Sequence, residues 1–255
     1  MNMVLTSAWI AVMFVGGMWW VQRDIAAYAR FQTQSDTLER QSLYRRWLIE
    51  SFVVLVGASI VSLWLAHALW PFDGFPSAFA PAGRLQASDE EISSDKWLSI
   101  AIGLFFGIVL SVAIQWRGLK RSLSPQVGPD QALIPRNRRE AMLALLLSLN
   151  AGFSEELFFR LALPLLLFQV TGSLAVSFGF SILAFGLAHA HYGWKGVLAT
   201  TAAGALLTVY YLHHGSLLRV MIAHAVIDIV AFFIRPAIAD WLISRKAPRW
   251  AVAAS

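Results

Sequence analysis

The sequence predicts an all-α fold, a polytopic transmembrane helix bundle with seven or eight spans. Hydrophobic side chains make up 58% of the 255 residues and charged ones only 14%, whereas soluble proteins carry about 25% charged residues. Several apolar runs reach the roughly 20 residues that a helix needs to cross a hydrocarbon core of about 30 Å. Basic and acidic loops alternate between these runs, as they do between the spans of an integral membrane protein.

Three spans are predicted in the first half of the chain. They cover residues 4–21, 48–70 and 97–115. The first span ends in Trp19 and Trp20, and tryptophans also flank the third, as expected where a helix meets the membrane interface. No basic residue precedes the first span and no small-residue cleavage site follows it, so we interpret it as a retained signal anchor.

Four more spans are predicted after residue 140, where the sequence is nearly continuously apolar. They cover about residues 141–170, 173–190, 197–212 and 216–234. Turns at residues 192–196 and 213–215 separate the last three of them. The fourth span is long, and we expect it to bend at Gly152 or Pro164, because glycine and proline weaken a helix.

The charge of the connecting segments predicts the orientation of the chain. Segments 22–46 and 117–140 are basic and loop 71–96 is acidic. Because basic loops stay on the cytoplasmic side, we expect the N-terminus outside and the C-terminus in the cytoplasm, in a bacterial inner (cytoplasmic) membrane. The chain then divides into three parts: spans one to three with the basic loop at 1–139, a core at 140–235, and a basic interfacial tail at 236–255.

The composition also limits the chemistry of any site. The chain has no cysteine, which excludes disulfides and thiolate metal ligands. The net charge of +5 comes mostly from loops predicted to be cytoplasmic, and no strand pattern interleaves aromatic with basic residues. We therefore expect the lipid bilayer, and no nucleic acid, as a partner. A metal would have to be bound by His, Asp or Glu.

Ionisable residues are concentrated in three of the predicted spans. Span four holds Glu155, Glu156 and Arg160, span five ends with His189, and span seven holds Arg219, His224 and Asp228. An ionised side chain near the centre of a bilayer costs roughly 2.5–3.5 kcal/mol on insertion scales. This concentration, in place of scatter, predicts that the three spans share one polar pocket.

The residue types and their spacing are typical of a catalytic metal site. His224 and Asp228 lie one turn apart on one helix face, the spacing with which H-E-x-x-H helices bind zinc. His189 would be a third ligand, and Glu155 would either complete the site or activate a water. Two histidines and a carboxylate with a water form a usual catalytic zinc shell. We therefore predict Zn²⁺ as the cofactor, with Glu156 and Arg160 paired in support.

Each part of the pattern also has a purely structural explanation. Glu156 with Arg160 could be a structural ion pair, and His224 with Asp228 a hydrogen-bonded helix pair. The other histidines lie near predicted helix ends, where histidines are usually interfacial or hydrogen-bonded: His67, His191, His213 and His214. The coincidence of all three sets in one chain favours the functional interpretation.

Three motifs in order resemble those of the CPBP family. They are Glu155-Glu156-x-x-x-Arg160, Phe185-x-x-x-His189 and His224-x-x-x-Asp228. The members are intramembrane metalloproteases related to the type II CAAX prenyl endopeptidases, and are also known as Abi or bacteriocin-immunity proteins. The resemblance covers about residues 140–235 and has no counterpart in the first three spans.

The resemblance implies a role for each motif residue. Glu155 would be the general base for the attacking water, and the metal or water would be surrounded by His189, His224 and Asp228. Glu156 and Arg160 would support them. The last motif position is often Asn in the eukaryotic CAAX enzymes, whereas it is Asp228 here. The added negative charge would favour direct metal ligation over stabilisation of an oxyanion.

The leading hypothesis is an intramembrane metalloendopeptidase that hydrolyses a peptide bond in a membrane-associated peptide or protein. The alternatives are a non-catalytic bacteriocin-immunity or membrane scaffold protein of the same fold, and an ion-coupled transporter. Transporters often show internal repeats, and none is found here. A straight fourth span would place Glu155 deeper than His189, so we expect a break at Gly152 with Ser154 as N-cap, or a re-entrant entry.

Overall fold

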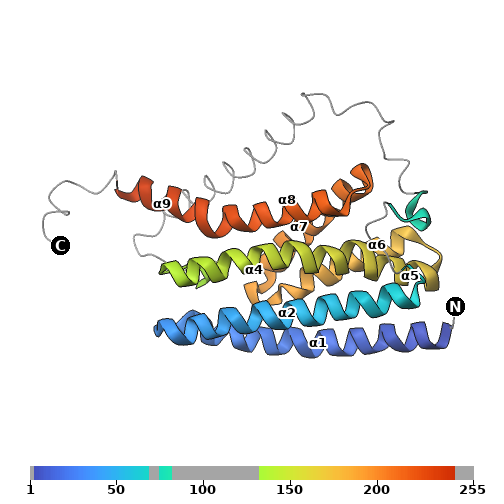
Figure 1. Ribbon diagram of the computed structural model, residues 1–255, viewed down its shortest axis with the longest axis horizontal. Coiled ribbons are helices and arrows are strands. Elements are labelled where there is room, and N and C mark those ends of the chain that lie inside the picture. Colours follow the sequence, from blue (N-terminus) through green and yellow to red (C-terminus); the bar gives the residue numbers. More distant parts are fainter. Residues whose placement is uncertain (1–2, 69–74, 82–131, 245–255) are drawn as a thin grey trace, which may run out of the picture.

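The structure, a computed structural model, describes residues 3–68, 75–81 and 132–244, and every regular element in these ranges is helical (Figure 1). The α-helices are α1 (Met3–Thr33), α2 (Thr37–Leu65), α4 (Arg138–Glu156), α5 (Leu163–Thr171), α6 (Leu174–Ala188), α7 (Gly193–His214), α8 (Leu217–Ile229) and α9 (Arg235–Ser244). Two π-helical segments, η4 (Leu157–Ala162) and η6 (Val230–Ile234), and two short 3₁₀ turns, η1 (Ser77–Phe79) and η5 (Ala190–Tyr192), complete the set.

These helices confirm an all-α polytopic membrane bundle. Five helical segments are long and apolar enough to span a membrane: Met3–Thr33, Thr37–Leu65, Arg138–Thr171, Ala190–His214 and Leu217–Ile238. A sixth apolar helix, Leu174–Ala188, is shorter. The predicted third span, residues 97–115, lies outside the described residues. The protein is therefore an integral membrane protein with six apolar helices in the part that the structure describes.

The predicted polar segment at residues 22–46 is helical along almost its whole length, so the prediction of a loop was wrong. Helix α1 continues to Thr33 and α2 begins at Thr37. The Asp36 carboxylate caps α2 by accepting from the backbone N–H groups of Leu38 and Glu39, in the sequence pattern of an N-cap with a glutamate at the third helical position. Hydropathy marks where a helix leaves the lipid, and both helices continue beyond that point.

Short polar and glycine signals define the other helix ends. Asn137, Ser173 and Ser216 each cap a following helix, α4, α6 and α8 respectively, by accepting from a backbone N–H three residues on. Gly172 and Gly215 end α5 and α7 in the left-handed conformation, with φ of 65° and 63°, which glycine adopts without a steric penalty. These signals fit the predicted limits of spans five to seven.

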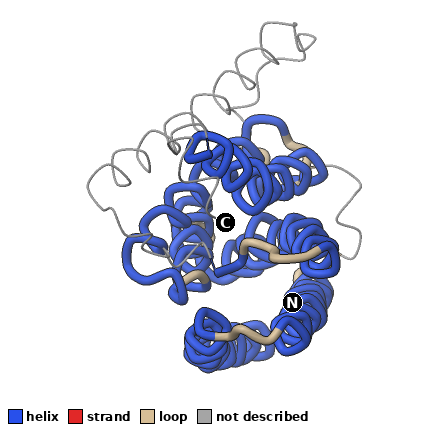
Figure 2. Tube along the Cα trace, turned by 90° about the vertical axis from the view of Figure 1, so that its left-hand side faces the viewer, coloured by secondary structure: helices blue, strands red, loops and turns tan. Residues whose placement is uncertain are grey.

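The helices form a bundle (Figure 2), in which α4 lies between α2 and α8 (Figure 1). Helices α2 and α4 run parallel, because Asn150 Nδ2 donates to Ser51 Oγ at 2.7 Å and Gln169 Nε2 donates to the Ala66 carbonyl at 2.9 Å. Helix α1 runs antiparallel to α2, with Trp9 Nε1 donating to Ser62 Oγ at 3.0 Å. The continuous rod of α4, η4 and α5 is therefore held in register with α2 at Asn150 and at Gln169.

Helix α4 passes through Gly152 without a break, so the predicted break and the N-cap at Ser154 were wrong. The Ser154 hydroxyl donates to the Asn150 carbonyl at 2.8 Å inside the helix. Gly152 instead permits close packing on α8: a Cβ there would lie 2.6 Å from the Met221 carbonyl oxygen and 2.9 Å from the Ala225 Cβ. The glycine sets the distance between two helices.

The helical hydrogen bonding changes only at η4, which joins α4 to α5 in one continuous rod. Pro164 lies in the first turn of α5, where the missing N–H of proline is tolerated. The bend predicted at Pro164 is thus replaced by the wider π-helical turn just before it. Segments of this kind are rare and often occur at functional sites.

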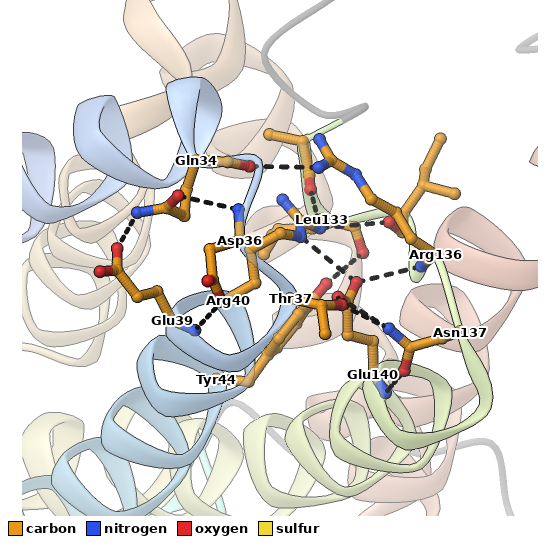
Figure 3. A network of polar contacts seen from close by, with 12 residues as sticks. Gln34, Asp36, Thr37, Glu39, Arg40, Tyr44, Leu133, Arg136, Asn137 and Glu140 are labelled. Atoms are coloured by element: carbon orange, nitrogen blue, oxygen red, sulfur yellow. Dashed lines mark hydrogen bonds and ion pairs between the residues drawn. The ribbon is translucent and has the colours of Figure 1, made fainter.

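A buried polar network joins the turn between α1 and α2 to the start of α4 (Figure 3). At its centre Arg40 pairs with Glu140 at 3.3 Å, and both side chains are fully buried. Arg136 donates to the Gln34 carbonyl at 3.1 Å, and the Tyr44 hydroxyl donates to the Leu133 carbonyl at 2.8 Å. We call this region, residues 34–44 with 132–140, the turn end of the bundle.

Candidate functional site

The six candidate site residues come from α4, from η4 that continues it, from the end of α6, and from α8. Glu155 and Glu156 are the last residues of α4, Arg160 is in η4, His189 follows α6 as its C-cap, and His224 and Asp228 are on α8. The Phe185 ring lies among them, with ring centroids 4.8 Å from His189 and 5.9 Å from His224 and with the Arg160 guanidinium 4.3 Å away. Residues distant in sequence therefore surround one aromatic side chain.

The Glu156 carboxylate connects two of these elements. One oxygen pairs with Arg160 Nε at 2.9 Å, and the other accepts from His224 Nδ1 at 2.5 Å. Glu156 is fully buried, Arg160 is 1% exposed, and Arg160 also donates to the Gly204 carbonyl at 3.4 Å. The pair with Arg160 has the predicted spacing of one turn. The bond from Glu156 to His224 was not predicted, because nothing in the spacing links residues 68 positions apart.

Two carboxylates face histidines across gaps that are too long for hydrogen bonds. Glu155 Oε2 lies 3.8 Å from His189 Nε2, and Asp228 Oδ2 lies 3.9 Å from His224 Nε2, beyond the range of a hydrogen bond. Among the described residues, Glu155 Oε2 is buried without a hydrogen-bond partner. Asp228 also interacts electrostatically with Glu155 and Glu156. The simple hydrogen-bonded pair of His224 with Asp228 is therefore not formed.

Hydrogen bonds at the other ring nitrogens determine which nitrogen of each histidine is free. His189 Nδ1 lies 2.9 Å from the Phe185 carbonyl oxygen, and a carbonyl can only accept, so this nitrogen carries the proton. His224 Nδ1 likewise donates to the Glu156 carboxylate. In neutral imidazoles the Nε2 atoms then carry the lone pairs. Both lone pairs belong to the nitrogens that face Glu155 and Asp228.

These side chains fit a bound metal ion in their chemistry. Metal-binding histidines usually donate the second ring N–H to a carboxylate or a backbone carbonyl, as His224 and His189 do. Imidazole nitrogens and carboxylate oxygens are common zinc ligands. However, within the described ranges no three His, Asp or Glu side chains are assembled as a metal-binding group. The donors are present as two histidine–carboxylate pairs.

Both π-helical segments begin next to site carboxylates. Segment η4 starts directly after Glu156, and η6 starts two residues after Asp228. A π-helical turn changes which faces of a helix its two ends present. Glu156 and Asp228 thus lie at or near the end of a regular α-helix, and the residues after each π-helical turn face a different direction. A hydrophobicity pattern cannot reveal such a change of one residue.

The predicted conflict of depth between Glu155 and His189 is resolved by helix length. Arg23 of α1 lies over the Trp19 and Trp20 rings and contacts Glu50 of α2, a composition typical of the membrane interface. Ser51 follows Glu50 and bonds to Asn150, and Glu155 is five residues further along α4, or about 7.5 Å. The first turns of α4 therefore lie beyond this level, together with the turn end.

A second polar group lies beside the site and was not predicted as part of it. His191 Nδ1 contacts Asp24 Oδ2 at 2.8 Å, and the His191 ring lies 4.9 Å from Tyr28 and 4.1 Å from Tyr192. The sequence predicts His191 to be interfacial or hydrogen-bonded; in the structure its Nδ1 has Asp24 as an ion-pair partner and forms no hydrogen bond with a described residue. That partner could not be identified, because Asp24 falls in the segment interpreted as a loop.

Comparison with known proteins finds one family model. Residues 137–230, which include all six candidate site residues, match the family model described as type II CAAX prenyl endopeptidase Rce1-like. No curated protein and no solved structure matches the chain. The described helices and this match support an integral membrane protein with a segment that is similar to a protease family.

The matched segment supports the family resemblance that the motifs predict. It is similar to the Rce1-like domain of the CPBP/CAAX protease-like proteins over residues 137–230, somewhat over a third of the chain. The matched range coincides closely with the 140–235 expected from the motifs. Helices α1 and α2 lie outside the matched range, although they pack on its helices.

Proposed function

We propose that the protein is an intramembrane metalloendopeptidase that hydrolyses a peptide bond in a membrane-associated peptide or protein. The observation that supports it best is the pair of histidines whose Nε2 atoms face carboxylates at 3.8 and 3.9 Å, with each Nδ1 held by an acceptor. A structural ion-pair network would be expected to close such gaps. Side chains arranged in this way can accept a ligand between them.

Glu155 is the general base of the proposed reaction. Its side chain is 17% exposed, and its Oε2 has no hydrogen-bond partner within the described part of the chain. A carboxylate in this state can accept a proton from an attacking water and pass it to the leaving amine. The neighbouring Glu156 is fully buried and occupied by Arg160 and His224, so it cannot serve as the base. Its role is to orient His224.

A zinc ion would be held by Nε2 of His189 and of His224, with Asp228 as the carboxylate ligand. When bound, such an ion polarises a carbonyl and lowers the pKa of a bound water toward neutrality. Arg160 neutralises the charge of Glu156 at 2.9 Å, so the negative charges left near the ion are those of Glu155 and Asp228. The Phe185 ring excludes water from the side of Arg160.

The position of the site fits a substrate held in or near the membrane. Glu155, His189 and Asp228 are partly exposed, whereas His224 and Glu156 are buried behind them. The partly exposed side is about 7.5 Å along α4 from the level of the Arg23 and Glu50 contact. We propose that the turn end faces the cytoplasm of a bacterial-type cell, as the loop charges predict, so that water enters from that side.

The test compares new protein N-termini in membranes of cells that express the wild type, Glu155→Gln or Glu39→Gln. Glu39 is an exposed carboxylate on α2 and is the matched control. We expect a set of N-termini in the wild type and the control that is reduced about 10²- to 10⁴-fold in Glu155→Gln, the usual contribution of a general base. Identical sets for wild type and Glu155→Gln would contradict proteolysis and favour the non-catalytic immunity or scaffold alternative.

A further inference from the structure

Helix α1 contributes one member of a partly buried pair beside the site. Asp24 of α1 contacts His191 of η5 at 2.8 Å, with side chains that are 17% and 13% exposed. The proposed mechanism uses neither residue, and Asp24 lies outside the segment that matches the protease family. A carboxylate in partly buried surroundings is usually paired, and the partner here, His191, lies two residues after His189.

The contact holds the turn that carries His189. His189 ends α6, and the chain then passes through the single 3₁₀ turn η5 into α7 at Gly193, which has a φ of 75°. Residues at a helix C-terminus lack part of the helical hydrogen bonding and tend to fray. Because His191 is two residues beyond His189, anchoring it to α1 restricts the backbone that presents His189 to Glu155.

Aromatic packing extends this restraint to the His189 ring itself. Tyr192 lies 6.2 Å from His189 in a stacked arrangement, at 23° between the ring planes, and it packs edge-on against Tyr28 at 5.5 Å. The His191 ring lies 5.9 Å from that of His189. Together Asp24 and Tyr28 of α1 contact His191 and Tyr192, whose rings in turn lie beside that of His189.

We propose that Asp24 and His191 are positioning residues of the site: their contact fixes the turn between α6 and α7 so that His189 Nε2 faces Glu155. This inference rests on the proposed function, because it concerns the binding of the same metal by the same histidine. By this proposal α1 helps to position a residue of the site, although the family match begins only at residue 137. The contact acts on His189 through the backbone and does not touch the reacting atoms.

The test titrates purified, metal-free protein in detergent with Co²⁺ alone and records the visible d–d absorption bands, which report the ligands around the ion. The variants are Asp24→Leu, which removes the contact, and Asp24→Asn, whose side chain keeps the shape of Asp24 and leaves an oxygen able to contact His191 Nδ1. Loss of a supporting contact typically weakens metal binding 10- to 100-fold. We expect about a tenfold weaker Co²⁺ affinity and altered bands for Asp24→Leu, with near wild-type behaviour for Asp24→Asn.

Glu50→Leu is the matched control. It removes the contact of Glu50 with Arg23, which joins α1 to α2 and does not involve η5. We therefore expect Glu50→Leu to leave the Co²⁺ affinity and the absorption bands unchanged. The inference is overturned if Asp24→Leu binds Co²⁺ as the wild type does, or if Glu50→Leu weakens binding equally. Failure of the wild type to bind Co²⁺ would instead contradict the proposed metal site. Asp24→Asn covers the case in which Asp24→Leu does not fold.

Discussion

The protein contains two buried pairs of arginine and glutamate that differ in how well their surroundings satisfy them. At the turn end, Arg40 pairs with Glu140, and at the site Arg160 pairs with Glu156; all four side chains are at most 1% exposed. Each guanidinium also lies over a phenylalanine ring, at 4.2 Å from Phe31 and 4.3 Å from Phe185. The two pairs are thus alike in burial and in the stacking of the arginine.

The two regions differ in whether the carboxylate oxygens near each arginine have hydrogen-bond partners. Both Glu140 oxygens are satisfied, by Thr37 at 2.8 Å and Asn137 at 3.1 Å on one side and by Arg40 and the Arg136 backbone N–H on the other. Beside the site pair, Glu155 Oε2 has no hydrogen-bond partner among the described residues and faces His189 across 3.8 Å. The Glu140 carboxylate is satisfied on both oxygens, as expected of a group that stabilises a fold, whereas an unsatisfied buried carboxylate oxygen is often found at a functional site.

The largest effect on stability is expected at the turn end. Glu140→Ala would leave Arg40 buried and uncompensated, and removing one partner of a buried pair costs about 3–5 kcal/mol of unfolding free energy. Equilibrium unfolding in lipid bicelles, followed by circular dichroism, measures this loss. Glu39→Ala, at an exposed position on the same helix as Arg40, serves as control and should change the stability by less than about 0.5 kcal/mol. Equal effects of the two variants would show that the network contributes little.

A smaller loss of stability is expected where α4 packs on α8. Gly152→Ala would place a Cβ 2.6 Å from the Met221 carbonyl oxygen, and overpacking of this kind costs about 1–3 kcal/mol. It should also lower cleavage, because the same contact brings Glu156 to His224. The control is Gly57→Ala on α2, where the new Cβ has no neighbour within 4 Å in the described structure and should stabilise by up to about 1 kcal/mol. A neutral Gly152→Ala would contradict the close approach.

The smallest effect on stability is expected at the site carboxylate itself. Glu155→Gln keeps the shape of the side chain, removes an unsatisfied charge, and should change the unfolding free energy by less than about 0.5 kcal/mol or raise it, as substitutions at functional sites often do. The same unfolding measurement applies, with Glu140→Gln as the matched substitution at the turn end. A loss at Glu155 as large as that at Glu140 would remove the distinction between the two regions.

Much of this architecture could be predicted from composition and motif spacing. Apolar run lengths gave the helical membrane fold, and the ionisable residues of spans four, five and seven lie around Phe185. Local signals such as Asp36 and Gly215 define helix ends, although hydropathy alone misplaced the end of α1. The sequence pattern of Asp36 followed three residues later by Glu39 was the signal that could have corrected it.

The remainder depends on contacts between distant parts of the chain. The bond of Glu156 to His224 spans 68 residues and that of Asp24 to His191 joins α1 to η5; neither follows from any periodicity. Gly152 was interpreted as a helix breaker, because a sequence does not show that another helix needs the space. The two π-helical segments depend on packing around the site and leave no pattern in the composition.

The central claim is that side chains from α4, α6 and α8 form one metal-dependent site, and zinc content tests it most directly. The measurement is inductively coupled plasma mass spectrometry of purified protein, comparing the wild type with His189→Ala/His224→Ala, each checked for native helix content by circular dichroism. We expect about one Zn²⁺ per wild-type chain, as for a catalytic site with protein ligands and an open position, and almost none in the double variant. Equal zinc content in the two proteins, or no zinc in either, would contradict the claim.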